Sequence, residues 1–197
     1  MAIKRILDVL LSFILIIAFC PLFLIISILI KTSSKGPVFF IQERIGKDTS
    51  LFKMFKFRTM VENAESSGSG LFSYEDDPRI TKIGHILRRM SIDELPQLFN
   101  VLIGDMSLVG PRPPVTYELG DINDFSEELK ARFRMKPGIT GLAQVSGRND
   151  LEWPDKIKFD NQYIDSFRDQ GIFMDFRILI KTIFVVLAMA NIVEKKK

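Results

Sequence analysis

The strongest constraint on this chain is an apolar run near its N-terminus. Val9–Ile30 contains no charged side chain. A straight α-helix over this run would be about 33 Å long, which is enough to cross the hydrocarbon core of a membrane. A chain of 197 residues is short for two independent cores. We therefore expect a membrane segment over residues 1–35 and one compact domain over residues 36–197.

The pattern around this run favours a re-entrant helix hairpin, which enters the membrane and returns to the same face. Pro21 lies near its centre and would kink or break the helix. Basic residues flank both ends of the run: Lys4, Arg5, Lys31 and Lys35. By the positive-inside rule, both ends should then be cytoplasmic. A plain transmembrane span is the second interpretation, and a cleaved signal peptide is the third because no small-residue cleavage site follows.

Two charged residues lie at the start of the run and are spaced for contact on a helix. Asp8 follows Arg5 by three positions. At that spacing the two side chains lie on one helix face, which predicts an ion pair. Such a pair would lower the cost of placing charge near the membrane boundary.

A basic segment follows the apolar run and indicates an anionic partner. Residues 31–60 include only two acidic residues, Glu43 and Asp48, but seven basic ones: Lys31, Lys35, Arg44, Lys47, Lys53, Lys56 and Arg58. Acidic lipid headgroups, substrate phosphates or nucleic acid would each fit this charge. Its position directly after an apolar segment favours lipid or phosphate.

The scarcity of Cys and His excludes several kinds of site. Cys20 is the only cysteine and lies inside the apolar run, which excludes a disulfide framework and a Cys-based zinc site. His85 is the only histidine, which excludes zincin motifs. The sequence also lacks the Gly-x-Ser-x-Gly elbow of a Ser-His-Asp hydrolase. The chemistry must therefore depend on carboxylates, basic groups and a hard metal ion.

The remaining sequence predicts a small α+β domain that is mostly helical. Strands are expected at Pro37–Ile41 and Leu51–Met60, and a polar loop at Glu65–Asp77. Helical periodicity is expected over the segments Ile83–Met90, Leu95–Leu102, Leu151–Phe167 and Met174–Ile192. The last helix is apolar on one side, which is typical of a helix in the membrane interface with Lys195–Lys197 near anionic headgroups. Ordinary core packing is the alternative.

An acidic pair, Asp93-Glu94, lies just before the expected helix at Leu95–Leu102. Ser91 and Glu94 have the spacing of a capping box, so a purely structural role is one interpretation. In the other, a helix N-terminus binds phosphate, Asp93 attacks phosphorus as a nucleophile, and Glu94 holds magnesium. A glycosidase pair fits poorly, because neighbours on one helical turn do not flank a sugar.

Five basic residues are candidates for binding the phosphates or base of a substrate. Arg88 precedes the acidic pair, Arg112 is fixed between two prolines, and Arg148 follows a Gly-rich loop. Lys56 and Arg58 belong to the basic segment. For Arg112 and Arg148, a structural or surface role is the alternative.

Several motifs resemble those of the bacterial sugar transferases, the monotopic polyprenol-phosphate phosphoglycosyl transferases. The closest is Ser91–Leu102, which reads SIDELPQLFNVL. The others are Lys4-Arg5-x-x-Asp8, Phe55–Met60, Gly104–Ser107, Gly110–Pro113, Lys136–Val145 and Gly147–Asn149. The motifs occur in the same order as in the family, and the resemblance extends from about Lys4 to Thr182. One departure is Cys20-Pro21, where the family usually has Ser-Pro, and this puts the angle of the helix break in doubt.

The resemblance implies a short, catalytic-core form with an acyl-phosphate mechanism. Asp93 would be the nucleophile, and Glu94 would act with it through magnesium. The expected substrates are a UDP-sugar and undecaprenyl phosphate at the cytoplasmic face of the bacterial inner membrane. The products would be UMP and a polyprenyl-diphosphate-sugar, in the first membrane step of a surface or glycoprotein glycan.

Two other functions stay open from the sequence. One is a non-catalytic, membrane-tethered scaffold of an envelope glycan assembly, which would not need the Asp93 carboxylate. The other is a membrane-tethered nucleic-acid binder that uses the basic segment. The acidic pair argues against both, and we expect no nucleic-acid partner. The sequence leaves open the sugar, the glycan pathway and whether the chain forms a homo-oligomer.

Overall fold

The fold is mostly helical, with two small sheets. The computed structural model describes residues 2–64 and 77–188. In chain order these form α1 (Ala2–Ser33), β1 (Phe39–Ile45), η1 (Lys47–Thr49), β2 (Leu51–Phe57), α2 (Lys82–Arg89), η3 (Ile92–Glu94), α3 (Gln97–Ile103), β3 (Ser107–Val109), η4 (Ile122–Asp124), α4 (Glu127–Ala131), η5 (Arg132–Arg134), β4 (Gly138–Thr140), α5 (Leu142–Ser146), η6 (Arg148–Asp150), α6 (Trp153–Gln170) and α7 (Ile172–Leu187). The mostly helical α+β class predicted from the sequence is confirmed.

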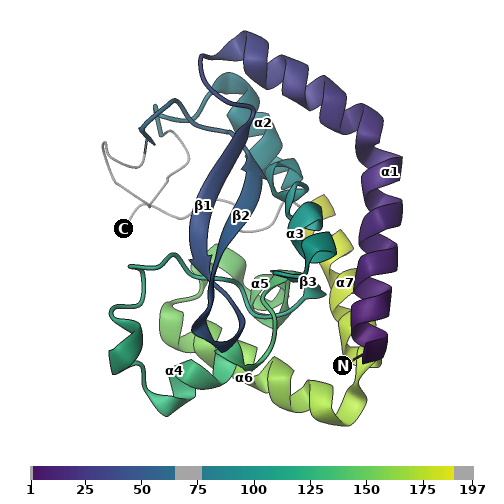
Figure 1. The fold of residues 1–197 in the computed structure, drawn as a ribbon, viewed down its shortest axis with the longest axis vertical. Helices are drawn as coiled ribbons and strands as arrows, with labels where there is room; N and C mark the ends of the chain where they lie inside the picture. The colour runs from purple at the N-terminus through teal and green to yellow at the C-terminus, as the bar shows by residue number, and fades with distance from the viewer. Residues whose placement is uncertain (1, 65–76, 189–197) are drawn as a thin grey trace.

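Helix α1 runs the length of the molecule and contains Pro21 in its interior. It stays one helix through the proline and is visibly bent (Figure 1). It is long and apolar enough to cross a membrane, and only 11% of its most apolar window is buried. A helix in a soluble core would be mostly covered, so its exposure agrees with membrane association. The re-entrant topology and the domain boundary after residue 35 stay predictions.

The first sheet is the antiparallel hairpin β1-β2, which pairs from Phe39↔Phe57 to Ile45↔Leu51. Its alternation was predicted from the sequence. Phe52 and Met54 of β2 lie on one face and are buried in the main core, because successive strand side chains point to opposite faces. Phe57, on the opposite face, is buried against α1 and α2. The second sheet pairs β3 with β4 in parallel.

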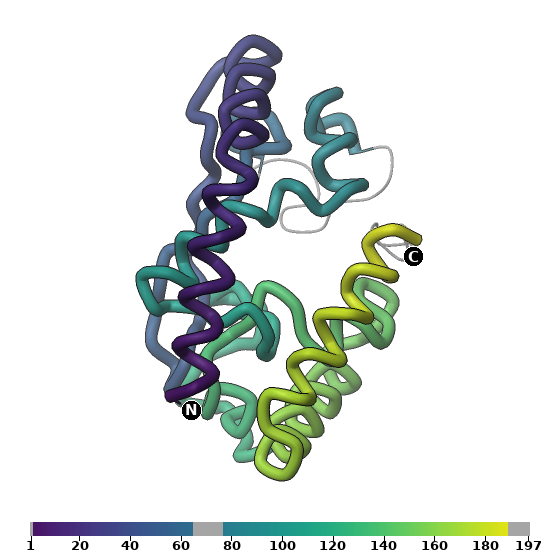
Figure 2. Tube along the Cα trace, turned by 90° about the vertical axis from the view of Figure 1, so that its right-hand side faces the viewer, coloured from purple at the N-terminus to yellow at the C-terminus, as the bar shows by residue number. Residues whose placement is uncertain are grey.

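The largest apolar core lies between these sheets and the helices. Its buried members come from β2, α3, β3, α6 and α7 and the loops beside them: Phe52, Met54, Leu98, Val101, Met106, Leu108, Val109, Met135, Tyr163, Ile164 and Ile178. A second cluster joins Ile26 and Ile30 of α1 to Phe57 and Leu87. Figure 2 shows α1 along one side of the molecule and the α6-α7 pair on the other.

The first turns of α1 are bound to the core by charged side chains, though not by the predicted pair. The expected Arg5–Asp8 ion pair is wrong. Arg5 donates to the carbonyls of Val101 (2.6 Å) and Leu102 (3.0 Å), near the C-terminus of α3, where a cation is favourable. The Asp8 carboxylate accepts from Ser107 Oγ and Leu108 N.

Helix α7 exposes much of its apolar side. Leu179 packs against the core, whereas large apolar side chains along the rest of the helix are exposed: Phe173, Phe176, Ile180, Ile183, Phe184 and Leu187. This pattern agrees better with a helix in the membrane interface than with core packing. The terminal lysines, Lys195–Lys197, and most of the loop expected at Glu65–Asp77 lie outside the described residues.

Candidate active site

The acidic pair lies in a short connection between two helices. Asp93 and Glu94 are in the 3-10 turn η3, and α3 begins only at Gln97, after Pro96. Ser91 has left-handed backbone angles (φ 56°) and its side chain caps no backbone amide. The capping-box interpretation is therefore wrong. The pair also does not lie on the first turn of a long helix, so the expected phosphate-binding helix N-terminus is absent from the described part of the site.

Glu94 is held as a carboxylate by two basic side chains. Its Oε1 lies 3.0 Å from Lys56 Nζ and 3.2 Å from Arg112 Nη2. Burial alone would raise the pKa of Glu94, but the charges of Lys56, Arg112 and Arg148 outweigh it and hold that pKa well below its usual range. Glu94 is thus ionised at any physiological pH.

Asp93 is in a different state from its neighbour. It is 9% exposed, and within residues 2–64 and 77–188 its carboxylate accepts no hydrogen bond and forms no ion pair within 4 Å. Burial is the main cause that raises the pKa of Asp93 to about 6; Lys56 opposes the shift and the negative charge of Glu94 adds to it. A buried carboxylate without partners is a reactive anion once it loses its proton.

Lys56 reaches the acidic pair because an amide side chain joins β2 to α3. The Asn100 side chain is buried, accepts from the backbone N–H of Phe55 (2.9 Å) and donates to the carbonyl of Lys53 (2.7 Å). These two hydrogen bonds fix β2 against α3 and so place Lys56, the residue after Phe55, beside Glu94. Burial lowers the pKa of Lys56, and the Glu94 charge opposes that shift.

Arg112 is positioned through its own backbone. Its carbonyl accepts from Arg132 Nη2 (2.7 Å), and Arg132 in turn forms a fully buried ion pair with Asp160 (2.7 Å). The flanking prolines restrict the backbone further. The close approach of α5 to this segment requires a glycine, since a Cβ on Gly141 would lie 2.1 Å from the carbonyl oxygen of Gly110.

The structure brings four of the five predicted basic residues to the acidic pair or the segments beside it. Besides Lys56 and Arg112, Arg148 lies here: its Nη2 donates to Ser91 Oγ (2.8 Å). Burial lowers the pKa of Arg148, and the negative charge of Glu94 opposes this shift. Burial also lowers the pKa of Arg88, and the negative charge of Asp93 opposes this shift. The Arg88 Nε also donates to Thr59 Oγ1 (2.9 Å).

Arg58 is the exception. Arg58 is 6% exposed, and its guanidinium donates to the carbonyls of Ile30, Ser34 (3.0 Å) and Lys35 at the C-terminal end of α1. Cations are favourable at a helix C-terminus. The side chain therefore fastens the end of α1 to β2, and a role for Arg58 in substrate binding stays an untested prediction.

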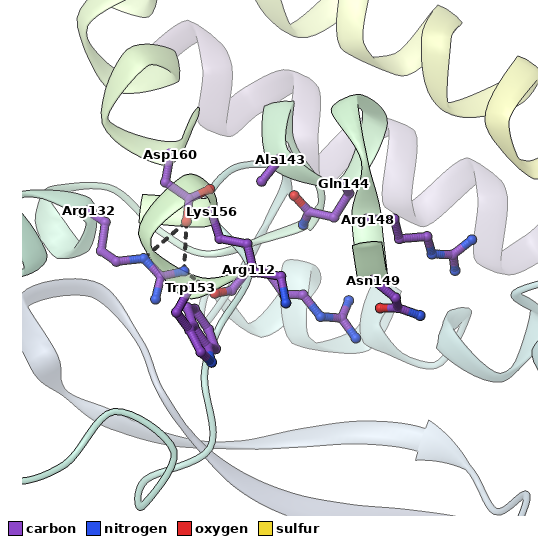
Figure 3. A pocket seen from close by; sticks show the side chains of 9 residues that line it. All are labelled: Arg112, Arg132, Ala143, Gln144, Arg148, Asn149, Trp153, Lys156 and Asp160. Atoms are coloured by element: carbon purple, nitrogen blue, oxygen red, sulfur yellow. Dashed lines mark hydrogen bonds and ion pairs between the residues drawn. The ribbon is translucent and has the colours of Figure 1, made fainter. Parts of the chain in front are cut away.

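A cavity opens beside the acidic pair, and Figure 3 shows the side chains that line it. It has a volume of about 30 Å³ and is lined by Arg112, Arg132, Ala143, Gln144, Arg148, Asn149, Trp153, Lys156 and Asp160. Five of these residues were not predicted from the sequence as site residues: Arg132, Gln144, Trp153, Lys156 and Asp160. Gln144 lies within a quoted motif, which could have drawn attention to it, whereas Arg132 and Asp160 carry no local signal.

The donor set fits magnesium only if a substrate completes it. Among residues 2–64 and 77–188, no three acidic, His or Cys side chains gather to hold a metal ion. Magnesium is commonly bound by one or two carboxylates together with substrate phosphates and water. Glu94 offers Oε2, since both its basic partners contact Oε1. The residues present therefore fit a magnesium ion shared with a phosphate.

Comparison with known proteins identifies the relatives of the chain. A family model described as bacterial sugar transferase matches residues 1–189. An exopolysaccharide production protein, ExoY, from Sinorhizobium fredii is 42% identical over 194 residues, which cover 91% of this chain and 83% of the relative. The undecaprenyl-phosphate glucose phosphotransferase of Komagataeibacter xylinus is 43% identical over 188 residues, covering 91% of this chain and 35% of the relative.

A third relative acts on a named donor. The UDP-glucose:undecaprenyl-phosphate glucose-1-phosphate transferase of Klebsiella pneumoniae is 40% identical over 189 residues, covering 93% of this chain and 40% of the relative. The chain thus spans most of the length of the ExoY protein but well under half of the two named transferases.

Proposed function

The chain belongs to the bacterial sugar transferase family and is a phosphoglycosyl transferase, and we propose that it transfers a sugar 1-phosphate from a UDP-sugar to undecaprenyl phosphate. The products would be UMP and undecaprenyl-diphosphate-sugar. In this proposal the reaction is the first membrane step of a surface or glycoprotein glycan. The relatives' names support the lipid carrier and the UDP-sugar, and they differ in the sugar.

The observation that carries the mechanism is the contrast between the two carboxylates. Glu94 is neutralised by Lys56 and Arg112, whereas Asp93 is buried beside it without a partner among the described residues. An unpaired carboxylate keeps its oxygen lone pairs available for attack, while a paired one does not. Asp93 is therefore the nucleophile, and Glu94 balances the positive charges of Lys56 and Arg112.

The transfer would take place in two half-reactions. An Asp93 carboxylate oxygen attacks the phosphorus that bears the sugar, and the bond from this phosphorus to the oxygen of the UMP phosphate breaks. UMP leaves with that electron pair, and the sugar phosphate stays on Asp93 as a mixed anhydride. A phosphate oxygen of the lipid carrier then attacks the same phosphorus, and Asp93 leaves as a carboxylate.

The basic residues would bind the diphosphate of the donor. Arg112 and Arg148 line the cavity next to the acidic pair, and guanidinium groups bind phosphate oxygens in a bidentate manner. Bound magnesium would screen the repulsion between the attacking carboxylate and the diphosphate. Glu94 would hold it through Oε2, together with oxygens of the substrate.

The membrane arrangement follows from the location of the lipid substrate. The exposed, apolar α1 and the exposed apolar side of α7 would enter the cytoplasmic leaflet of the inner membrane, and the basic segment would face acidic headgroups. This places the headgroup of undecaprenyl phosphate and the soluble donor on the same face. A shared covalent intermediate lets the two substrates use one site in turn.

A single-turnover experiment tests the proposal. The purified protein in nanodiscs without undecaprenyl phosphate is mixed with each member of a panel of UDP-sugars, and UMP is quantified. We expect one donor to release UMP in an amount equal to the enzyme, followed by sugar phosphate transfer when the lipid is added. Strict dependence of the first UMP on the lipid would replace the covalent route with a direct ternary transfer. No release from any UDP-sugar, with or without lipid, would contradict the proposed function.

A further inference from the structure

The backbone that carries Arg112 is held in place by its carbonyl groups. In the segment Pro111–Pro114, three of the four residues are prolines, which have no backbone N–H to donate. Each of the four carbonyl oxygens accepts a hydrogen bond from another part of the chain. The donors, in the order of the acceptors, are Gly138 N (2.9 Å), Arg132 Nη2 (2.7 Å), Arg44 Nη1 (3.1 Å) and Ile45 N (3.1 Å). The bond to the carbonyl of Arg112 itself thus comes from a side chain, that of Arg132.

The guanidinium of Arg132 is fixed on several sides. Its Nε and Nη2 both donate to Asp160 Oδ2, at 3.0 and 2.7 Å, and Figure 3 shows this pair. Its Cζ lies 5.3 Å from the ring centroid of Phe133 and 5.0 Å from that of Trp153. The group that binds the Arg112 carbonyl therefore has a single, well-defined orientation, set by η5 on one side and α6 on the other.

Burial separates this pair from any substrate. The side chains of Arg132 and Asp160 are each only 1% exposed, whereas the side chain of Arg112 is 39% exposed. A bound donor can therefore contact the Arg112 guanidinium but cannot contact the pair behind it. Any effect of the pair on the reaction must pass through Arg112.

The pair is an expensive way to stabilise a fold. Arg132 Nη1 and Asp160 Oδ1 are buried and have no hydrogen-bond partner within the described residues. Burial raises the pKa of Asp160, and the charge of Arg132 opposes this shift. Apolar residues of similar volume are often as stabilising as a buried ion pair, or more so. A role in placing a neighbouring group explains the pair better than stability does.

We propose that Arg132 and Asp160 are positioning residues for the transfer, because through the Arg112 carbonyl they hold the Arg112 guanidinium where it can bind the donor diphosphate. Held in this way, Arg112 Nη2 lies 3.2 Å from Glu94 Oε1, beside the acidic pair. The inference rests on the proposed function, since it takes Arg112 as a ligand of the UDP-sugar. It adds two residues that never touch the substrate.

Replacement of the whole pair separates positioning from stability. Arg132→Met/Asp160→Leu removes both charges and the bond to the Arg112 carbonyl, so no unpaired charge is left buried. Binding of UDP with magnesium to the full-length protein in nanodiscs is measured by calorimetry. We expect the affinity to fall about tenfold or more, which is the contribution of a well-placed hydrogen bond between charged groups. Arg168→Met/Asp165→Leu changes an exposed Arg–Asp pair of the same helix, and this matched control should bind UDP as the unchanged protein does.

A milder variant keeps the charge balance of the buried pair. Arg132→Lys retains a cation beside Asp160 but lacks the planar fork that reaches Asp160 and the Arg112 carbonyl together. It should weaken UDP binding in the same direction. In kinetics with the UDP-sugar, both variants should raise KM more than they lower kcat, since they weaken binding of the diphosphate in the ground state and in the transition state alike.

A double-mutant cycle tests whether the pair acts through Arg112. The change Arg132→Met/Asp160→Leu is repeated in a protein that already carries Arg112→Ala. With no guanidinium left to position, the change should have little further effect on the affinity for UDP. Thermal unfolding is recorded in parallel, and Arg132→Met/Asp160→Leu should be more stable than Arg132→Met, which leaves the Asp160 carboxylate buried alone.

The outcomes separate this inference from the proposed function. Unchanged UDP affinity in Arg132→Met/Asp160→Leu, or an equal loss with and without the Arg112 side chain, would overturn the positioning role even if UDP-sugars are turned over. A non-additive cycle for UDP binding, together with no turnover of any UDP-sugar, would support the positioning role and contradict the proposed reaction. Absence of UDP binding by the unchanged protein would contradict both.

Discussion

Lys4 Nζ lies 2.6 Å from Asp175 Oδ2, and this ion pair joins the first turn of α1 to α7 across 171 positions of sequence. Both side chains are below 10% exposed. Tyr163 donates to the other carboxylate oxygen (2.6 Å), and Lys4 also donates to the carbonyl of Val109 (3.0 Å). The start of α1 is thus fastened to the core by a buried ion pair whose two side chains each make a further hydrogen bond.

Removal of one partner of this pair should destabilise the protein strongly. Lys4→Met leaves the Asp175 carboxylate buried without its cation, and we expect a loss of about 3–5 kcal/mol. Thermal unfolding in detergent measures it. Lys130→Met breaks an exposed pair with Glu127 and is the matched control, with an expected loss below about 1 kcal/mol. The double variant Lys4→Met/Asp175→Asn should recover part of the loss; additive effects would show that the two side chains do not interact.

The first half-reaction should depend on the protonation of Asp93. Because the pKa of Asp93 is raised to about 6, chiefly by burial, its nucleophilic form is scarce at pH 5 and dominant at pH 7. We expect kcat/KM for the UDP-sugar to rise about tenfold per pH unit below pH 6 and to level off above it. Glu94 stays ionised over this range, since its pKa is held far below it. A flat profile from pH 5 to pH 7 would contradict the assignment of Asp93.

The same shift predicts that the nucleophile destabilises the fold at neutral pH. A raised pKa in the folded state means that the proton on Asp93 stabilises folding at low pH, and that this stability is lost as the pH rises through about 6. Asp93→Asn cannot ionise, so it should lose transferase activity almost completely but gain up to about 3 kcal/mol of stability at pH 8. At pH 4 the variant should gain nothing. Unfolding midpoints at both pH values measure this, and equal midpoints at pH 8 would contradict it.

Substitution of Glu94 should weaken the dependence on magnesium. Glu94→Gln keeps the volume but removes the anion that pairs with Lys56 and Arg112 and that would bind the metal. We expect turnover to fall by on the order of a hundredfold, because a metal in such a site contributes several kcal/mol to the transition state. Magnesium titrations should show a higher half-saturating concentration. Glu127→Gln, on an exposed carboxylate, is the control, and an unchanged titration curve in Glu94→Gln would remove this residue from the metal site.

The topology of α1 can be tested with introduced cysteines. Cys20 is exposed in the described structure, so it is first replaced by serine. Single cysteines at Ala2 and Ser34 are then labelled from either side of sealed vesicles. We expect both to react from the cytoplasmic side, and labelling from opposite sides would exclude the re-entrant topology. Pro21→Leu removes the proline at the bend of α1, so the helix should straighten into a full span and one of the two positions should move to the other side.

The sequence by itself determined the elements whose signal is local. The uncharged run Val9–Ile30 predicts α1, and alternation over Leu51–Met60 predicts the strand β2, because periodicity is a property of neighbouring residues. Helix α3 ends at Gly104, whose φ of 103° a glycine adopts readily. The acidic pair was also found from the sequence, since its motif is contiguous.

Only the tertiary structure decided which charges meet. Ser91 and Glu94 have capping-box spacing, yet Glu94 pairs with Lys56 and Arg112 from two distant segments. Arg58 looked like a phosphate ligand but binds the end of α1. Ion pairs and burial act through space and depend on segments far apart in the chain. The difference between a paired Glu94 and an unpaired Asp93 therefore exists only once β2, the Pro111–Pro113 loop and α3 have packed together.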